Sequence, residues 1–314
     1  MNPEPNAEGQ APAAGRPRIG WVGTGVMGLS MCRHMLGGGF EVDVFNRTPE
    51  RAEPLLELGA RWRDSPAEVA AEADAMFTIV GYPADVREVV LGADGAMAAL
   101  RPGSLLIELT TSEPSLAEEI YEAGRERGVE ALDAPVSGGD VGARAGELSV
   151  MVGGTPEGFT RAEPLMQPFS RRITLQGGPG AGQHTKMANQ IAICSGMVGV
   201  CEALLYAYRA DLDLQAALET IVAGAGNSWS LENYGPRLLA GDTAPGFKVD
   251  HFVKDLGVAL AESRRMELEL PGLALAEELY RRAQDQGLGE LGTHSLLLAL
   301  AEMSSVEWPA QPSA

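Results

Sequence analysis

Short apolar segments alternate with amphipathic segments along the first 180 residues of the chain. The apolar segments have the length of buried strands, and the amphipathic segments repeat their apolar residues with helical spacing. Strands are predicted at residues 18–22, 41–45, 75–80, 105–109, 129–132, 149–152 and 172–175. Helices are predicted at residues 26–36, 49–58, 66–73, 84–90, 115–127 and 156–168. This alternation predicts an α/β fold with a doubly wound, largely parallel sheet that carries helices on both faces.

The pattern changes after the glycine-rich residues 177–180. One helix is predicted from residue 183 to about 209, and it is apolar around almost its whole circumference. Such a helix has to be covered on several sides. No convincing strand follows, and the remaining sequence is typical of helices separated by glycine and proline. We therefore predict an all-helical C-terminal domain in residues 180–314, for substrate binding and oligomerisation, after a sheet domain in residues 17–179.

The charge and the ends of the chain restrict the classes of partner. A net charge of −19 argues against binding to nucleic acid or to an anionic membrane, because both need a basic face. No run of about 20 apolar residues is apparent, so we expect no membrane span. Residues 1–16 are rich in proline, alanine and glycine and lack the basic and apolar regions of a signal peptide. They are predicted to be a disordered tail.

Three cysteines occur, Cys32, Cys194 and Cys201, and all lie within helical patterns. We expect buried, apolar thiols. An odd and sparse count fits a reducing compartment, so the cytoplasm is the expected location. No cysteine–histidine spacing suggests a metal site.

The first strand leads directly into Gly23-Thr24-Gly25-Val26-Met27-Gly28, and a helix follows. In such a G-x-G-x-x-G sequence the first glycine permits a tight turn and the second lets the backbone approach a pyrophosphate. The third lets the helix pack closely on the strand, and the helix N-terminus favours an anion. Glycine turns without a ligand are common, but the position at the start of a strand–helix series predicts a dinucleotide site in a Rossmann-type fold.

The end of the second strand distinguishes between the two nicotinamide dinucleotides. A site for NAD would place a carboxylate here for the ribose 2′-hydroxyl. The chain instead has Asn46-Arg47-Thr48, and Asp43 lies three residues too early. An arginine beside a hydroxyl binds a 2′-phosphate through charge-assisted hydrogen bonds. We expect NADP (NADPH) rather than NAD.

Lysine is rare, since only Lys186, Lys248 and Lys254 occur and all other basic side chains are arginine. Arginine does not give up a proton near neutral pH, whereas a desolvated lysine can. A general replacement of lysine by arginine through base composition is the alternative explanation. Lys186 and Lys254 lie in polar, glycine-flanked segments, and Lys186 shares a helix face with Asn189 three residues later. We expect these lysines in an active site.

A second polar segment closes the strand at residues 129–132. It reads Asp133-Ala134-Pro135-Val136-Ser137-Gly138-Gly139. Ser137 offers a hydroxyl, and the glycines expose backbone N–H groups suited to a carboxylate. A simple glycine-rich turn is the alternative.

Four motifs in this order resemble the β-hydroxyacid dehydrogenases across residues 18–301. They are the glycine loop, the D-A-P-V-S-G-G segment, the G-x-G-x-x-x-K-x-x-N segment that includes Lys186 and Asn189, and K-D-L from Lys254. The resemblance implies a Rossmann domain joined by a long helix to a helical domain. It implies that Lys186 is the catalytic acid/base and that Asn189 is its neighbour in the substrate pocket.

The same resemblance assigns the remaining site residues. Ser137, Gly138 and Gly139 would bind the substrate carboxylate, and Lys254 would lie at the edge of both cofactor and substrate. The residues that would lie beside the cofactor are Tyr82, Pro83 and Thr111. The chain departs from the family pattern at Glu108, Tyr82, His184 and His251, which leaves the substrate open. We expect both histidines to be packing or surface residues, and Trp229 either to line the pocket or to belong to the core.

The predicted function is hydride transfer between the nicotinamide and a small hydroxy acid, aldehyde or keto acid. Glyoxylate, succinic semialdehyde or a 3-hydroxy acid would be suitable substrates. Imine reductases also resemble the chain, including Asn46-Arg47-Thr48, but generally lack the lysine at position 186. A non-catalytic dinucleotide-binding module is a further alternative. The apolar long helix predicts a homodimer or homotetramer.

Overall fold

The computed structural model describes residues 16–308. The disordered tail predicted for residues 1–16 lies outside this range except for Arg16. The Arg16 guanidinium donates a hydrogen bond to the Gly38 carbonyl and lies 5.6 Å from the centre of the Phe40 ring. Arg16 therefore belongs to the folded part of the chain.

The described chain contains one sheet of nine strands in the order β3-β2-β1-β4-β5-β6-β8-β7, with β9 paired to β8. The strands are β1 Ile19–Val22, β2 Val42–Phe45, β3 Arg61–Trp62, β4 Ala75–Thr78, β5 Leu105–Glu108, β6 Glu130–Asp133, β7 Val136–Ser137, β8 Leu148–Gly153 and β9 Ser170–Gly177. Pairing is parallel from β3 to β6 and between β8 and β9. β8 runs antiparallel to β6 and β7. The expected doubly wound, largely parallel sheet is confirmed. β3 and β7 were not predicted, because two residues are too few to show a period.

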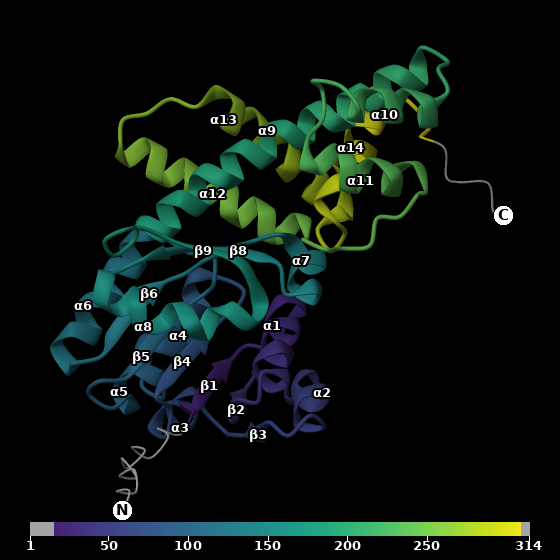
Figure 1. The fold of residues 1–314 in the computed structure, drawn as a ribbon. Coiled ribbons are helices and arrows are strands. Elements are labelled where there is room, and N and C mark those ends of the chain that lie inside the picture. The colour runs from purple at the N-terminus through teal and green to yellow at the C-terminus, as the bar shows by residue number, and fades with distance from the viewer. Residues whose placement is uncertain (1–15, 309–314) are drawn as a thin grey trace, which may run out of the picture.

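Helices cover both faces of this sheet (Figure 1). They are α1 Val26–Gly37, α2 Glu53–Leu56, α3 Pro66–Ala71, α4 Pro83–Leu91, α5 Ala96–Ala99, α6 Pro114–Arg127, α7 Gly139–Ala145 and α8 Pro156–Met166, with the 3₁₀ turns η1 Pro49–Ala52 and η2 Gln167–Phe169. One hydrophobic cluster joins Trp21 and Phe77 to α1 and α8, and another joins Val22 and Met76 to α3, α4 and α6. Neighbouring strand residues thus point to opposite, equally buried faces.

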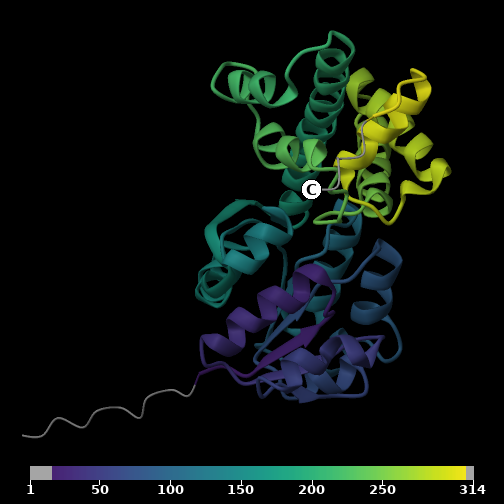
Figure 2. The same cartoon turned by 90° about the vertical axis from the view of Figure 1, so that its right-hand side faces the viewer.

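The sheet part ends at Gly177, and all the following elements are helical. They are α9 Ala181–Arg209, α10 Leu214–Val222, α11 Trp229–Leu239, α12 Val249–Arg265, α13 Pro271–Ala283 and α14 Leu296–Met303, with the short turns η3 Gln284–Leu288 and η4 Thr293–Ser295. α9 connects the sheet part to the helical part (Figure 2). The predicted division into domains at residue 179 stays a prediction.

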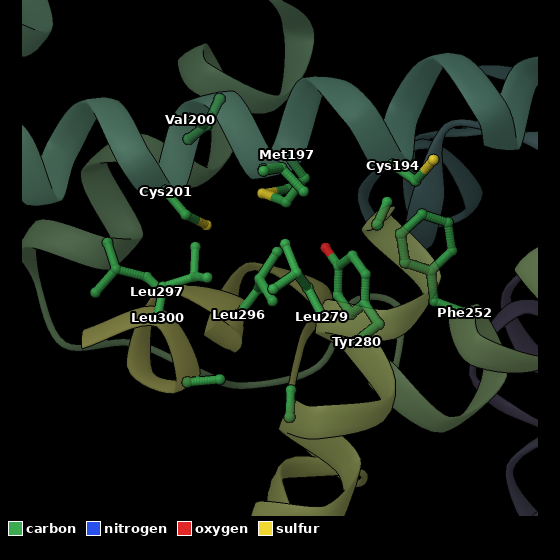
Figure 3. Close-up of a cluster of buried hydrophobic side chains, with 14 of the residues drawn as sticks. Cys194, Met197, Val200, Cys201, Phe252, Leu279, Tyr280, Leu296, Leu297 and Leu300 are labelled. Carbon is green, nitrogen blue, oxygen red and sulfur yellow. The ribbon is translucent and has the colours of Figure 1, made fainter. Parts of the chain in front are cut away.

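The side chains of α9 form the centre of the helical part. Figure 3 shows Met197 and Cys201 of α9 facing Tyr280 of α13 and Leu297 of α14. All three cysteines of the chain are free and buried, and burial raises the pKa of each thiol. The expectation of buried thiols is confirmed.

α9 bears on the expectation that no segment of the chain spans a membrane. Its 29 residues include an 18-residue window with a mean hydropathy of 1.6, which is long and apolar enough to cross a membrane by length and composition alone. The sequence did not suggest this because glycine, alanine, serine and cysteine interrupt its large apolar residues. The buried core helix of a globular protein passes the same test, and α9 packs against α10, α11, α12, α13 and α14.

Candidate active site

The glycine loop at residues 23–28 has the backbone geometry that its sequence predicts. Gly23 has a φ of +101°, and a Cβ there would lie 1.9 Å from the Ile79 carbonyl oxygen. A Cβ at Gly28 would lie 2.2 Å from the Gly23 carbonyl oxygen. Gly25 precedes α1 without a side-chain cap, and a Cβ there would meet nothing within 4 Å. The turn and the packing therefore need glycine, and the space beside the helix N-terminus is open to a ligand.

The three residues that follow β2 differ in their contacts. Asn46 accepts a hydrogen bond from the Thr24 backbone N–H at 2.9 Å and donates to the Thr48 carbonyl at 2.8 Å. Its amide therefore joins the glycine loop to the end of β2. Arg47 extends into solvent with 83 % of its side chain exposed, and it forms an ion pair of 3.1 Å with Asp85.

A cleft of about 1680 Å³ lies between the sheet part and the helical part. Its lining includes every predicted site residue except Pro83: Gly23, Thr24, Gly25, Val26, Met27, Gly28, Asn46, Arg47, Thr48, Tyr82, Thr111, Ser137, Gly138, Gly139, Lys186, Asn189 and Lys254. Pro83 is the first residue of α4, directly after Tyr82. The structure thus brings together residues that are up to 231 positions apart in the sequence, from Gly23 to Lys254.

Side chains of the helical part hold the loop that follows β5. Gln183 of α9 accepts from the Ser112 N–H at 2.9 Å and donates to the Thr110 carbonyl at 2.7 Å. Lys254 of α12 donates to the Thr111 carbonyl at 2.5 Å. Thr111 is therefore fixed in the cleft by contacts on both sides of it.

Asp133, at the end of β6, caps the N-terminus of α9. Its two carboxylate oxygens accept from the backbone N–H groups of Gly180 and Gln183, each at 2.8 Å. α9 has no side-chain cap of its own. The approach is close enough that a Cβ at Gly182 would lie 2.7 Å from the Asp133 carbonyl oxygen. This cap fixes Lys186, one turn further along α9, relative to the strand that leads to Ser137.

Lys186 lies at the point where the two parts of the chain meet. Its amino group is buried and donates to the Val136 carbonyl at 2.8 Å. Beside it, the Ser137 hydroxyl donates to the Asn189 amide oxygen at 3.3 Å. Gly138 and Gly139 follow with φ values of +132° and +62°, which side chains rarely adopt. The hydroxyl, the amide and the amine thus lie beside a glycine loop that lines the cleft.

A series of side-chain contacts leads from Asn189 to Lys254. The Asn189 amide donates to Gln190 at 2.8 Å, and Gln190 donates to the Asp255 carboxylate at 2.6 Å. Lys254 Nζ lies 2.8 Å from the other Asp255 oxygen, an ion pair without hydrogen-bond geometry. Gln190 and Asp255 are each 1 % exposed. The contacts of Ser137 are thus linked to those of Lys254 through two buried residues.

The surroundings change the proton affinity of Lys186. Burial lowers its pKa from 10.5 to about 8, the Asp255 charge raises it, and the Lys254 charge lowers it. The amine can therefore exchange a proton near neutral pH. Glu108, buried at the end of β5, has its pKa raised from 4.5 to about 8 by burial, which the Thr110 N–H partly offsets.

The remaining aromatic and histidine candidates lie in different places. Trp229 lines the cleft at the start of α11 with 51 % of the residue exposed, and its ring packs edge-on against Tyr234 at 5.5 Å. His251 also lines the cleft and packs edge-on against Tyr82 at 5.5 Å, which connects α12 to the start of α4. His184 is not among the cleft residues. Trp229 is therefore a pocket residue and not a core residue.

Four residues that organise the site had no predicted role: Gln183, Gln190, Asp255 and Asp85. The first two carried a usable signal, because positions 183, 186 and 190 lie on one face of a helix. Asp255 stood next to Lys254 without a predicted role. Within residues 16–308, no group of three or more His, Cys, Asp or Glu side chains is placed to hold a metal ion.

The open helix N-terminus at Gly25, the Arg47 guanidinium and a titratable lysine share one cleft. These residues fit a dinucleotide with an anionic backbone, and a proton donor lies in the same cleft. The fold and the site thus define a nicotinamide-dependent oxidoreductase with a Rossmann sheet and a helical second part.

Comparisons with known proteins agree with this class. Residues 18–178 match the NAD binding domain of 6-phosphogluconate dehydrogenase. Residues 180–300 match the family described as NAD-binding of NADP-dependent 3-hydroxyisobutyrate dehydrogenase. A probable 3-hydroxyisobutyrate dehydrogenase-like protein of Arabidopsis thaliana is 50 % identical over 92 % of this chain and 86 % of its own.

Solved structures agree as well. The 3-hydroxyisobutyrate dehydrogenase of Salmonella typhimurium matches 90 % of this chain and 99 % of its own with a TM-score of 0.82 and 31 % identity. A protein named Psf3, solved with NADP+ and 2-OPP, has the same coverage with a TM-score of 0.84 and 27 % identity. The chain belongs to the β-hydroxyacid dehydrogenase family, and it is an NAD(P)-dependent oxidoreductase.

Proposed function

We propose that the protein uses NADPH or NADP+ to interconvert a small hydroxy acid and the corresponding aldehyde or keto acid, with Lys186 as general acid/base. The observation that carries the proposal is the buried Lys186 amine, with a pKa near 8, in the same cleft as the glycine loop. A lysine with this pKa is present in both protonation states near neutral pH, as reversible acid–base chemistry requires.

The preference for NADP rests on Arg47. Its side chain is 83 % exposed, so part of the guanidinium remains accessible beside the ion pair with Asp85. Arg47 lies at the end of β2, the position that faces the adenosine ribose in this fold. Thr48 adds a hydroxyl next to it. The second family match and the NADP+ complex of Psf3 support this preference.

The substrate carboxylate is assigned to the Ser137 hydroxyl and the backbone N–H groups of Gly138 and Gly139. The positive φ values of these glycines form a tight loop without side chains, and a ligand carboxylate can approach its backbone closely. Asn189 orients the Ser137 hydroxyl by accepting its hydrogen bond. A carboxylate bound there would bring its neighbouring carbon towards Lys186, whose amine donates to the carbonyl of the adjacent Val136.

When bound, the reduced nicotinamide supplies a hydride to the carbonyl carbon. Lys186 stabilises the negative charge that grows on the carbonyl oxygen and donates a proton to that oxygen from Nζ. The Val136 carbonyl accepts one N–H of the amine and so fixes its direction. In alcohol oxidation the neutral Lys186 amine accepts the proton. Lys254 donates a hydrogen bond to Thr111 and so holds the loop that would lie at the edge of the cofactor.

The variant Lys186→Arg tests this assignment. It keeps the positive charge but cannot transfer a proton near neutral pH, so we expect a loss of about 10²–10⁴ in kcat. Cofactor binding, measured by quenching of protein fluorescence with NADPH, should change little. Near-normal turnover in this variant would contradict the proposal.

The substrate class and the cofactor are tested together by NADPH oxidation with a panel of small aldehyde and keto acids, repeated with NADH. Reduction of cyclic imines but not of keto acids would favour an imine reductase. Binding of NADPH without turnover of any panel member would favour a non-catalytic dinucleotide-binding module. A strong preference for NADH would overturn the role of Arg47.

The assembly and location are proposals of the same kind. A homodimer or homotetramer would cover the exposed face of α9, where Tyr206 is 76 % exposed and Gly199 has no neighbour within 4 Å of a Cβ position. Light scattering after size-exclusion chromatography tests this. Three free cysteines support a cytoplasmic location. We propose no nucleic-acid or membrane partner.

A further inference from the structure

The carboxylate of Asp85 is the ion-pair partner of Arg47. Asp85 lies in the first turn of α4, 38 positions after Arg47, and its Oδ1 is 3.1 Å from Arg47 Nη1. Its Oδ2 accepts from the Tyr82 backbone N–H at 3.1 Å and so caps α4. Both residues line the cleft together with the glycine loop. A negative charge thus lies directly beside the group proposed to bind the 2′-phosphate.

The two dinucleotides would meet this pair differently. A 2′-phosphate carries about −1.5 to −2 charges. It would have to draw Arg47 away from Asp85 or share the guanidinium with a carboxylate of the same sign. Like charges roughly 6 Å apart, at an effective dielectric constant of roughly 40–80, weaken binding by about 3- to 10-fold for each unit of charge. A 2′-hydroxyl carries no charge and can donate a hydrogen bond to a carboxylate.

The helix cap does not require this charge. An asparagine at position 85 would offer a carbonyl oxygen to the Tyr82 N–H in the same place. Among residues 16–308, Arg47 is the basic side chain that pairs with Asp85, and the other favourable contact of the charge is the N-terminus of α4, which stabilises it only weakly. Loss of the charge would therefore act mainly through Arg47 and the cofactor.

We propose that Asp85 is a specificity-determining residue of the cofactor site. In the free enzyme Asp85 forms an ion pair with Arg47, and its charge lowers the ratio of kcat/KM for NADPH to that for NADH. This inference rests on the proposed role of Arg47. The site then keeps a usable affinity for both dinucleotides.

Asp85→Asn tests the inference, with Glu88→Gln as the matched control. Glu88 lies one turn further along α4, lines the same cleft and has no ion pair with Arg47. We expect Asp85→Asn to raise the ratio of kcat/KM for NADPH to that for NADH by about 5- to 100-fold at low salt, because the phosphate carries about 1.5 to 2 charges. The gain should shrink in 0.5 M salt because exposed charges are screened. Glu88→Gln should change the ratio less than twofold.

Two results would overturn the inference: a ratio that is unchanged or lower in Asp85→Asn, or an equal rise in Glu88→Gln. Arg47→Ala separates this failure from that of the proposed function. If Arg47→Ala lowers kcat/KM for NADPH but not for NADH, while Asp85→Asn leaves the ratio of the two values unchanged, only the inference fails. If Arg47→Ala leaves the NADPH to NADH ratio unchanged, the NADP assignment itself fails. Equal melting temperatures of the wild type and Asp85→Asn would establish that the α4 cap is kept.

Discussion

Lys186 owes its proposed role to what surrounds its amino group. Burial removes water from the ammonium and lowers its pKa to about 8, while the charge of Asp255 limits the decrease. The Val136 carbonyl accepts only one of its hydrogens, so the others remain available to a ligand. A single side chain is thereby held in place and kept ready to titrate.

The rates of carbonyl reduction and of alcohol oxidation should therefore change with pH in opposite directions. Carbonyl reduction needs the ammonium, so its kcat/KM should fall as the pH rises through about 8. Alcohol oxidation needs the neutral amine, so its kcat/KM should rise through the same pH. Initial rates between pH 6 and pH 10 in both directions measure this.

Asp255→Asn provides the control for the pH dependence. Since the Asp255 charge raises the pKa of Lys186, its removal should move both inflections to lower pH. Asparagine can still accept the hydrogen bond from Gln190, so the packing is kept. Profiles without an inflection between pH 7 and pH 9 in the wild type would contradict the assignment of Lys186.

At the scale of the elements, the start of α9 is the junction that aligns the site. Asp133 of β6 caps the helix, and Gln183 in its first turn holds the loop after β5. Gly182, directly before Gln183, packs against β8, and a Cβ at this position would lie 2.4 Å from the Met151 carbonyl oxygen of that strand. The strand and the helix can meet at this distance only without a side chain.

Gly182→Ala should therefore lower the free energy of unfolding by about 1–3 kcal/mol, because the new methyl group overlaps backbone atoms that cannot move away. It should also reduce kcat, because α9 carries Lys186. Urea unfolding and steady-state rates measure the two effects.

Gly257→Ala is the matched control. Gly257 lies within α12, where a Cβ would meet nothing within 4 Å. Alanine in an open helix interior should raise the free energy of unfolding by about 0.5–1 kcal/mol. A loss of stability that is equal in both variants would contradict the role of Gly182.

At the scale of the whole molecule, the site lies at the boundary between the sheet part and the helical part. The sheet part contributes the anion-binding turns and Ser137, and the helical part contributes Lys186, Asn189 and Lys254. Glu108 and Lys186 are ionisable groups buried near this boundary. Burial of both affects the stability of the whole fold.

These two groups should give the stability a minimum near pH 8. Folded Glu108 keeps its proton up to about pH 8, whereas the unfolded side chain loses it near 4.5, so stability falls as the pH rises between these values. Folded Lys186 loses its proton near 8 and the unfolded side chain near 10.5, so stability rises over that range. The upper limits are about 5 kcal/mol for Glu108 and about 3 kcal/mol for Lys186.

Urea unfolding of Glu108→Gln and Lys186→Met at several pH values checks this prediction. Glu108→Gln should remove the fall between about pH 4.5 and 8, and Lys186→Met should remove the rise above 8. Unchanged slopes in these variants would contradict the pKa values on which the minimum depends.

Much of the fold could be predicted from the sequence because its signals are local. The seven predicted strands are present, since a buried strand shows as a short apolar run. β3, β7, α5 and α7 escaped prediction because segments of two to seven residues show too little of a period. α9 begins two residues earlier than predicted, because its cap comes from Asp133 and not from the preceding sequence.

The sequence by itself determined which residue types are present at the site. The glycine loop, Lys186 with Asn189, and the Ser137 segment are motifs whose chemistry depends on spacing within a few residues. Only the tertiary structure decided their partners. Asp85 lies 38 positions from Arg47, Asp133 lies 47 from Gly180, and Gln183 lies 73 from Thr110. Contacts over such separations follow from the packing of whole helices and strands. This packing places Asp255 where its charge changes the proton affinity of Lys186, and Asp85 where its charge faces Arg47.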